Sequence, residues 1–335
     1  MSSTSDIAKK LMESTQLVDE YMWEILKTRR PEVLYKAARH LIEAGGKRLR
    51  PFLVLSSCSL VGGEPKDAVP LAAAIELLHN FTLIHDDIMD NDELRRNVPT
   101  VHKLFGIPTA IASGDFLFAK VYEAVVRWAR EVRSPHERVM AIIDRLNWAA
   151  IQICEGQVLD VSFVSLEDVT EEDYFRMVGG KTAALLRASA EIGALAGGGT
   201  EEEVRLLGEF AYNAGLAFQL VDDYLGATAD EKVLGKPVGS DLREGKKTLI
   251  VIHALRHSSL EEKRKILGAL GRPKIDQEDM REINEILDSL GSLSYTMRRA
   301  EEYVEKAKGS LEGLRECEAK RDLLDLIEFF INREY

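Results

Sequence analysis

The chain alternates between segments with apolar residues every three or four positions and short polar breaks, which is the pattern of amphipathic helices. Between Pro31 and Gly45, for example, apolar residues recur at helical spacing: Val33, Leu34, Ala37, Ala38, Leu41 and Ile42. The same spacing predicts helices over 5–29, 31–44, 50–61, 67–89, 109–131, 135–162, 171–197, 201–226, 239–257, 277–289, 292–313 and 316–333. Strand-like alternation is scarce, so the pattern predicts an all-α protein.

The breaks between these segments are short, and none is a linker rich in Ser, Pro or Gly. Although a length of 335 residues favours about two domains, the short breaks predict one helical domain over 1–335. Its motif-bearing core spans about 30–260, and 261–335 form a helical C-terminal part. The longest irregular stretch, 90–108, is charged and follows an acidic motif, and loops of this length are often functional.

Composition narrows the class of protein. The 56 Asp and Glu outnumber the 44 Lys and Arg, so a general nucleic-acid binder is disfavoured. The three cysteines are odd in number and lack CxxC spacing, which argues against disulfides or zinc. The first ten residues lack the apolar core of a signal peptide, and no apolar run reaches 18 residues. We therefore expect a cytoplasmic protein without membrane insertion.

The two most apolar predicted helices, 67–89 and 210–225, each end in adjacent aspartates. Asp86 and Asp90 are four residues apart and share a helix face, as do Gln219 and Asp222 at three. Like charges at the end of a buried helix are costly unless they are neutralised. Mg²⁺ prefers such oxygen ligands and completes its shell with water and substrate phosphates. One such cluster could be a solvated helix end, but two predict metal-dependent handling of a phosphorylated substrate.

Basic residues beside glycines or after the acidic helix are candidate anion binders. They lie in the segment 45–51, in Arg95–Arg96, in Lys181–Thr182, at Lys236 and at Lys246. Glycine lets backbone N–H groups approach an anion, and arginine adds a two-pronged grip. Each basic run alone would be better explained as a solvated surface feature.

Together these motifs resemble the trans-isoprenyl diphosphate synthases, which include the farnesyl and geranylgeranyl diphosphate synthases. The resemblance covers roughly 30–260 and is greatest to archaeal short-chain members. It is carried by GGKRLRP (45–51), LLHNFTLIHDDIMD (77–90), RR (95–96), EGQVLD (155–160), KT (181–182), FQLVDD (218–223) and GKPVGSDLREGK (235–246).

The resemblance implies a fold and a reaction. The fold is a single large helical bundle around a deep central cavity, the isoprenoid synthase fold, usually as a homodimer. In the reaction, an allylic diphosphate (dimethylallyl, geranyl or farnesyl) ionises with the help of Mg²⁺, and isopentenyl diphosphate attacks the cation. Loss of a proton then leaves a chain one trans isoprene unit longer.

The resemblance also implies roles for individual residues. Catalysis would depend on Asp86, Asp90, Lys181 and Asp222. The metal ligands, for three ions, would be Asp86, Asp90 and Asp222, with Asp87 close by. Isopentenyl diphosphate would be bound by Lys47, Arg50, His79 and Arg96. The allylic diphosphate would be bound by Arg95, Lys181, Lys236 and Lys246, with Thr182 and Gln219 lining the position of the cation. Gln157 and Asp160 would support Lys181.

Two positions depart from the family pattern. Gly226 stands where the second acidic motif often has a fifth-position Asp, which leaves open whether Asp223 also binds metal. Asn97 follows Arg95–Arg96 where Gly is common. Neither change removes the neighbouring motifs, so neither is expected to abolish activity.

The residues one turn before the first acidic motif bear on product length. Phe81 is a lone aromatic five residues before Asp86, and the neighbouring Thr82 is small, a pattern that resembles synthases of C20 products. The predicted product is geranylgeranyl diphosphate, with farnesyl diphosphate as intermediate or co-product. Phe81 lies about 140° from Asp86 on a helical wheel, so an ordinary core role remains the alternative.

Three other functions remain as alternatives. A class I terpene cyclase usually has Ser or Thr and then Glu at four-residue steps after the aspartate, whereas Asp223 is followed by Ala227 and Glu231. His85–Asp86 also occurs in metal phosphohydrolases, but a matching set of further ligands is missing. A non-catalytic synthase subunit should have lost the first acidic motif, which is complete here. The ratio of C15 to C20 product and the preferred primer stay open.

Overall fold

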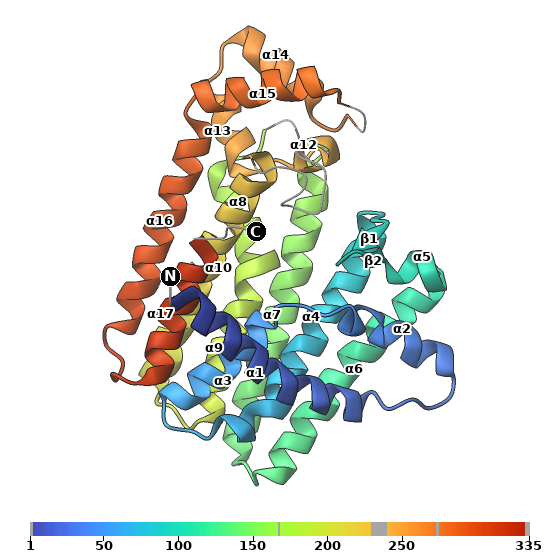
Figure 1. Ribbon diagram of the computed structural model, residues 1–335, viewed down its shortest axis with the longest axis vertical. Helices are drawn as coiled ribbons and strands as arrows, with labels where there is room; N and C mark the ends of the chain where they lie inside the picture. The colour runs from blue at the N-terminus through green and yellow to red at the C-terminus, as the bar shows by residue number, and fades with distance from the viewer. Residues whose placement is uncertain (1–2, 167, 229–239, 273–274, 332–335) are drawn as a thin grey trace. The chain divides into compact units, whose positions relative to one another are not determined.

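The computed structural model describes residues 3–166, 168–228, 240–272 and 275–331, and these are almost entirely helical (Figure 1). The α-helices are α1 (Ser3–Ile25), α2 (Glu32–Glu43), α3 (Leu49–Leu60), α4 (Val69–Met89), α5 (Val101–Phe105), α6 (Ile107–Glu131), α7 (His136–Phe163), α8 (Glu171–Val178), α9 (Ala184–Ala196), α10 (Glu201–Thr228), α12 (Ser240–Glu244), α13 (Leu249–His257), α14 (Leu260–Ala269), α15 (Gln277–Ser289), α16 (Ser292–Leu311) and α17 (Glu318–Ile331). A 3₁₀ turn, η1 (Pro65–Ala68), precedes α4, and a π-helical turn, η2 (Gly179–Ala183), joins α8 to α9.

The predicted all-α class is confirmed, two predicted helices need correction, and one helix was missed. The helix predicted over 171–197 is divided by η2 into α8 and α9. The helix predicted over 239–257 is α12 and α13, separated at Gly245, whose positive φ of 78° ends α12. Helix α14 was not predicted, although its start has a local signal. Ser259 and Glu262 form a reciprocal capping box there.

The stretch 90–108, predicted to be irregular, contains a small hairpin and two helix starts. Strands β1 (Leu94–Arg95) and β2 (Val98–Pro99) pair antiparallel, with Arg95 opposite Val98. The two turn residues, Arg96 and Asn97, have φ values of 54° and 62°. Asparagine tolerates this left-handed conformation better than most residues, so Asn97 fits a turn where glycine is common.

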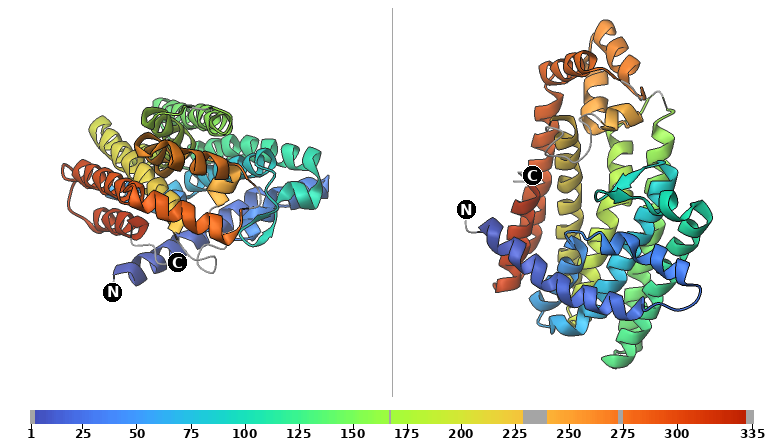
Figure 2. Two further views of the ribbon diagram at one scale, coloured as in Figure 1. Left: turned by 90° about the horizontal axis from the view of Figure 1, so that it is seen from above. Right: turned by 45° about the vertical axis from the view of Figure 1, so that its right-hand side comes forward.

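The chain divides into two compact units, and each is built from separate stretches of sequence. The first unit comprises Met1–Ile151, Leu185–Ala211 and Ser310–Leu326. In it, α4 packs against α6, α1 and α3 (Figure 2). Helix α4 is buried on nearly all sides, as its apolar sequence predicts, and residues such as Leu71, Ile75 and Leu77 are fully inaccessible.

By length and composition, the segment Pro65–Met89 is also the one described helix that could cross a membrane. In its most apolar 18-residue window, 67% is buried inside the protein. The core helix of a folded protein passes the same test, so this is weak evidence for a membrane span. The predicted absence of membrane insertion stays a prediction.

The second unit comprises Gln152–Ala184, Tyr212–Gly309 and Ile327–Tyr335. Its larger hydrophobic cluster joins α8, α10, α13 and α16, and includes Tyr174, Leu220 and Leu249. A second cluster joins α13 to α14 and α15, which lie side by side (Figure 1). Each unit is assembled from three separate stretches of sequence, so the two units are not consecutive domains. The single domain expected from the short breaks stays a prediction.

Candidate active site

The first acidic cluster lies at the last turn of α4, in the first unit. Asp90 caps the helix, while the Asp87 side chain is only 1% exposed and that of Asp86 is 17% exposed. Arg95, from β1, forms an ion pair with Asp87 and approaches Asp86 at 3.6 Å and Asp92 at 3.4 Å. Burial raises the pKa of Asp87 to about 6, and the Arg95 guanidinium opposes that rise. The structure therefore places Arg95 on this acidic cluster as its counter-charge.

The residues predicted to set product length lie one turn earlier on the same helix. The Phe81 ring makes edge contact with His85, at a centroid distance of 4.7 Å, and packs against Phe118 of α6 at 5.1 Å. The Thr82 hydroxyl donates a hydrogen bond to the His79 carbonyl at 2.8 Å. Both side chains are half-buried, so their role in product length stays a prediction.

Three of the four residues predicted to bind isopentenyl diphosphate lie near one another in the first unit. The Arg50 Nη1 atom is 3.2 Å from Nε2 of His79. The Arg96 guanidinium donates to the carbonyls of Leu41, at 2.7 Å, and Gly45. The fourth residue, Lys47, is exposed. Arg50, His79 and Arg96 are called the cationic cluster below.

The cationic cluster carries positive charge that its surroundings balance only in part. The pKa of Arg50 is lowered to about 10, chiefly by burial; Glu76 opposes this change and the charge of Arg96 adds to it. Burial and then Arg50 hold the pKa of His79 well below its ordinary value, so this imidazole is neutral at pH 7. The Arg50 Nε atom is buried without a hydrogen-bond partner among the described residues. Charges arranged in this way favour binding of an anion.

Arg48, in the middle of the same glycine-rich segment, has a different position. Its side chain is 1% exposed and pairs with Asp19 of α1 at 2.9 Å and Glu76 of α4 at 3.0 Å. It also donates to the carbonyl of Ile42 in α2 at 3.1 Å. Arg48 thus links three helices and faces the interior of the unit.

The second acidic cluster lies near the end of α10, in the second unit. Asp222 is exposed, whereas Asp223 is 6% exposed. The Tyr174 hydroxyl donates to Asp223 Oδ2 at 2.7 Å, and Gln219 Nε2 donates to Oδ1 at 2.9 Å. Burial and then the charge of Asp241 raise the pKa of Asp223 to about 8, against the effect of those two hydrogen bonds.

The KT motif is placed by the π-helical turn η2. The Lys181 Nζ atom contacts Asp160 Oδ2 at 2.6 Å, and the Thr182 hydroxyl donates to Gln219 Oε1 at 2.9 Å. The predicted contact between Asp160 and Lys181 is confirmed. The predicted partner Gln157 is buried, and its Nε2 atom has no hydrogen-bond partner within the described parts of the chain.

Close packing of η2 against α7 fixes this arrangement. A Cβ atom on Gly156 would lie 2.3 Å from the backbone nitrogen of Lys181, and one on Gly180 would lie 2.6 Å from the Gln152 carbonyl oxygen. Both positions therefore require glycine, because backbone atoms cannot move aside. Single π turns inside α-helices occur frequently at functional sites, and this one carries the two KT residues.

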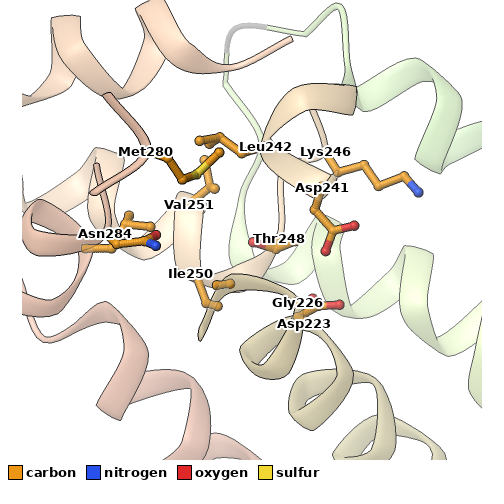
Figure 3. A pocket seen from close by; sticks show the side chains of 12 residues that line it. Asp223, Gly226, Asp241, Leu242, Lys246, Thr248, Ile250, Val251, Met280 and Asn284 are labelled. Atoms are coloured by element: carbon orange, nitrogen blue, oxygen red, sulfur yellow. The ribbon is translucent and has the colours of Figure 1, made fainter. Parts of the chain in front are cut away.

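A small pocket of the second unit adjoins Asp223 (Figure 3). Beside Asp223, its polar lining is Asp241, Lys246, Thr248 and Asn284, and apolar side chains from α10, α12, α13 and α15 complete it. The Asp241 carboxylate lies near Gly226, with Oδ2 3.2 Å from where a Cβ on that glycine would be. Asp241 therefore brings a carboxylate close to the position where the family pattern often has its fifth-position Asp.

The remaining predicted lysines can be placed only in part. Lys246 contacts Glu244 at 2.7 Å. Burial acts to lower the Lys246 pKa, but the charges of Glu244 and Asp241 outweigh it and raise the pKa. Lys236 lies outside the described residues. Tyr174 and Asp241 were not predicted. Asp241 lies inside the GKPVGSDLREGK segment that carries the family resemblance, whereas nothing in the sequence distinguishes Tyr174 from an ordinary core residue.

The donor atoms of both acidic clusters are compatible with Mg²⁺. Among the described residues, no three His, Cys, Asp or Glu side chains converge as ligands of one ion. Mg²⁺ is commonly held by one or two carboxylates and completed by water and phosphate oxygens, so a sparse set of carboxylates suits it. The Asp87 Oδ2 atom is also buried with no hydrogen-bond partner in the described residues.

Comparison with known proteins gives concordant matches over nearly the whole chain. The polyprenyl synthetase family matches residues 31–287. A short chain isoprenyl diphosphate synthase of Methanothermobacter thermautotrophicus is 44% identical over 335 residues, covering 100% of both chains. A geranylfarnesyl diphosphate synthase of Aeropyrum pernix is 43% identical, covering 94% of this chain and 98% of its own. The crystal structure of a geranylgeranyl pyrophosphate synthetase from Pyrococcus horikoshii Ot3 superposes with a TM-score of 0.94 at 42% identity, covering 99% of each chain.

Proposed function

Because the chain belongs to the polyprenyl synthetase family, we propose that it condenses isopentenyl diphosphate with allylic diphosphates in the trans configuration. The allylic substrates are dimethylallyl, geranyl and farnesyl diphosphate. The final product is geranylgeranyl diphosphate, with farnesyl diphosphate as intermediate or co-product. The similarity to a geranylgeranyl pyrophosphate synthetase over 99% of the chain supports this product length.

The single observation that carries this proposal is the cationic cluster. Arg50 contacts the neutral imidazole of His79, on which the charge of Arg96 also acts, and Arg50 keeps a buried nitrogen without a described partner. A diphosphate would supply the missing negative charge and accept hydrogen bonds from both guanidinium groups. Together with Lys47, these residues bind isopentenyl diphosphate, a second diphosphate site for which a terpene cyclase has no use.

The two acidic clusters bind the magnesium on which the family depends. Asp86, Asp90 and Asp222 are the ligands, for three ions in each active site. When bound, the metal neutralises the charge of the departing diphosphate. Asp87 stays with Arg95 at the first cluster, and Asp222 is the accessible carboxylate of the second.

The basic residues Arg95, Lys181, Lys236 and Lys246 bind the allylic diphosphate. Lys181 is oriented for this by Asp160, which holds its ammonium group at 2.6 Å. Positive charge fixed in place before the reaction stabilises the negative charge that develops as the carbon–oxygen bond breaks. Thr182 and Gln219 present oxygen atoms to the allylic cation, while apolar surroundings exclude the water that would quench it.

Phe81 and Thr82 limit the length of the growing chain. The Phe81 ring contacts both His85 and Phe118, so a change of rotamer would lose both contacts. The small Thr82 leaves room that a second aromatic residue would fill. The enzyme is proposed to act as a cytoplasmic homodimer without membrane insertion or nucleic-acid partners.

Product analysis with the purified chain tests this function. The chain is incubated with Mg²⁺, isopentenyl diphosphate and each allylic diphosphate in turn, and the products are treated with phosphatase and sized. Linear C20 alcohols that disappear when the metal is chelated are expected. Cyclic hydrocarbons would indicate a terpene cyclase, and diphosphate release without isopentenyl incorporation would indicate a hydrolase. Activity that requires an added partner chain would indicate a non-catalytic subunit.

A further inference from the structure

Four side chains of the second unit form one continuous line of hydrogen bonds. Tyr174 of α8 donates to Asp223 Oδ2 at 2.7 Å, and Gln219 donates to Asp223 Oδ1 at 2.9 Å. The other end of the same amide, Gln219 Oε1, accepts from the Thr182 hydroxyl at 2.9 Å. The line thus joins a fully buried tyrosine to the half-buried threonine of the KT motif.

The direction of these hydrogen bonds is fixed from the Asp223 end. Oδ1 of Asp223 accepts, so Gln219 must present its NH₂ group there and its carbonyl oxygen to Thr182. Thr182 has one hydroxyl proton and donates it to Gln219, so its oxygen offers only lone pairs in other directions. This assignment is the same whether Asp223 is ionised or carries a proton on Oδ2 and donates it to Tyr174. A proton on Oδ1 does not fit, because the Gln219 NH₂ group faces that oxygen.

Tyr174 is the rigid end of the line. It is 1% exposed, and its ring lies in the larger hydrophobic cluster of the second unit and makes an edge contact with Phe175 at 5.3 Å. Because the ring is held in place, the position of its hydroxyl oxygen is fixed, and Asp223 lies within hydrogen-bond distance of it. Both oxygens of Asp223 are therefore engaged by neutral donors, whereas its neighbour Asp222 is exposed.

We propose that Tyr174 and Asp223 are positioning residues that fix the Gln219 amide and thereby turn the lone pairs of Thr182 toward the allylic cation. This inference depends on the proposed prenyl transfer. An oxygen that presents lone pairs stabilises a carbocation, whereas an O–H group turned toward it would oppose its formation. Asp223 is accordingly not a metal ligand, and Asp222 alone serves the metal from this helix.

Removing only the hydroxyl of Tyr174 tests the proposal. In Tyr174→Phe the ring packing is preserved, so kcat should fall about 10-fold, which corresponds to about 1.4 kcal/mol, while both KM values change less than about 2-fold. The matched control is Tyr295→Phe, which also loses a tyrosine–carboxylate bond in this unit, to Glu171 at 2.7 Å. An unchanged kcat in Tyr174→Phe, or an equal loss in the control, would overturn the proposal.

A double-mutant comparison separates positioning from general structural damage. If Tyr174 acts through the threonine, adding Tyr174→Phe to Thr182→Val should cost little beyond the single Thr182→Val change. Losses that multiply would show that Tyr174 acts independently of Thr182, and the proposed line would be wrong.

A measurement on the resting protein keeps the inference separate from the proposed activity. In protein labelled with ¹⁵N in glutamine side chains, the Gln219 NH₂ resonance is identified by its loss in Gln219→Met. Hydrogen-bonded to the buried Asp223 side chain, it should lie downfield of exposed glutamines and exchange slowly, and both properties should be lost in Tyr174→Phe. If this signature is present but the wild-type chain transfers no prenyl group, the proposed function fails while the hydrogen-bonded line stands. If Tyr174→Phe leaves the signature unchanged, the positioning role itself is contradicted.

Discussion

The two acidic clusters have the same Asp–Asp sequence, but the protein compensates their buried charge differently. In each pair the second aspartate is buried, and the first is the more accessible. At the first cluster, buried Asp87 is matched by the full positive charge of Arg95. At the second, buried Asp223 receives only the neutral donors Tyr174 and Gln219.

This difference teaches that adjacent aspartates of one motif can have different environments, one accessible to a ligand and one buried against protein groups. Burial raises the pKa of both aspartates. The pKa of Asp87 reaches about 6 because the charge of Arg95 opposes the rise, whereas the pKa of Asp223 reaches about 8 because the charge of Asp241 adds to it and only the neutral donors Tyr174 and Gln219 oppose it. In the proposed function, the accessible member of each pair, Asp86 or Asp222, binds the metal. The buried member holds a neighbouring group in place.

The largest expected effect comes from removing the accessible members. Asp86→Ala and Asp222→Ala should each reduce the rate of isopentenyl incorporation by about 10²–10³-fold, because the departing diphosphate loses metal-mediated stabilisation. The measurement is the initial rate at saturating Mg²⁺, with Asp67→Ala on the exposed surface of η1 as control. Full-speed elongation in either variant would remove that cluster from the reaction.

The next effect concerns the charge balance of the first cluster. Arg95→Gln should lower the urea midpoint of unfolding by the equivalent of about 3 kcal/mol, because Asp87 would remain buried without its counter-charge. The double variant Arg95→Gln/Asp87→Asn should recover most of this loss, since no buried charge then remains. A single variant as stable as the wild-type chain would contradict the assignment of Arg95 as counter-charge.

The pH dependence of stability should distinguish the two buried aspartates. Each folded-state pKa is raised above the ordinary 3.8, so the folded protein keeps a proton that the unfolded chain releases. The stability gained at low pH is lost as the pH rises to about 6 for Asp87 and about 8 for Asp223, by at most about 1.4 kcal/mol per pH unit.

Asparagine variants measure these two contributions separately. In metal-free protein, the stability of Asp87→Asn relative to wild type should rise between about pH 4 and 6 and then level off, and that of Asp223→Asn should go on rising up to about pH 8. Arg95, Asp86 and Asp92 face the first group; Tyr174, Asp241 and Asp222 face the second. Urea unfolding at several pH values is the assay, and identical windows for both variants would refute the contrast.

The smallest effect on rate is expected for substitutions that change product length. Only α4, the helix of the first cluster, is expected to control that length. Phe81→Ala should shift the product beyond C20 and Thr82→Phe should shift it toward C15, each with a turnover within about 3-fold of wild type. Chromatography of the dephosphorylated alcohols gives the chain lengths. An unchanged distribution in Phe81→Ala would assign that ring to the core alone.

The sequence was sufficient for the fold class and the family, since periodic apolar spacing and ordered motifs are local properties of the chain. Burial of the helices that carry Asp86 and Asp222 followed from their apolar composition, and the contact between Asp160 and Lys181 was also predicted. The turn η2 was not, because a π turn differs from an α-helix only in hydrogen-bond register, to which the residues Gly179–Ala183 give no clear signal.

The contacts of Asp87 with Arg95 and of Asp223 with Tyr174 could not be predicted from the sequence for a different reason. The position of Arg95 beside Asp87 depends on the β1–β2 hairpin, whose two-residue strands are too short to leave a periodic pattern. Tyr174 lies 49 positions from Asp223, so their hydrogen bond arises only when α8 packs against α10. The metal ligands and diphosphate contacts themselves stay predictions.

The interior position of Arg48 affects how inherited or engineered changes in the segment 45–51 should be interpreted. Loss of Arg48 removes links to α1, α2 and α4 at once, so fewer molecules would reach the folded state, and those that did would keep normal specific activity. Loss of nearby Arg50 should do the reverse, giving abundant but slow protein. A growth screen alone would score the two as equivalent, and only soluble yield measured beside turnover per molecule would separate a folding defect from a chemical one.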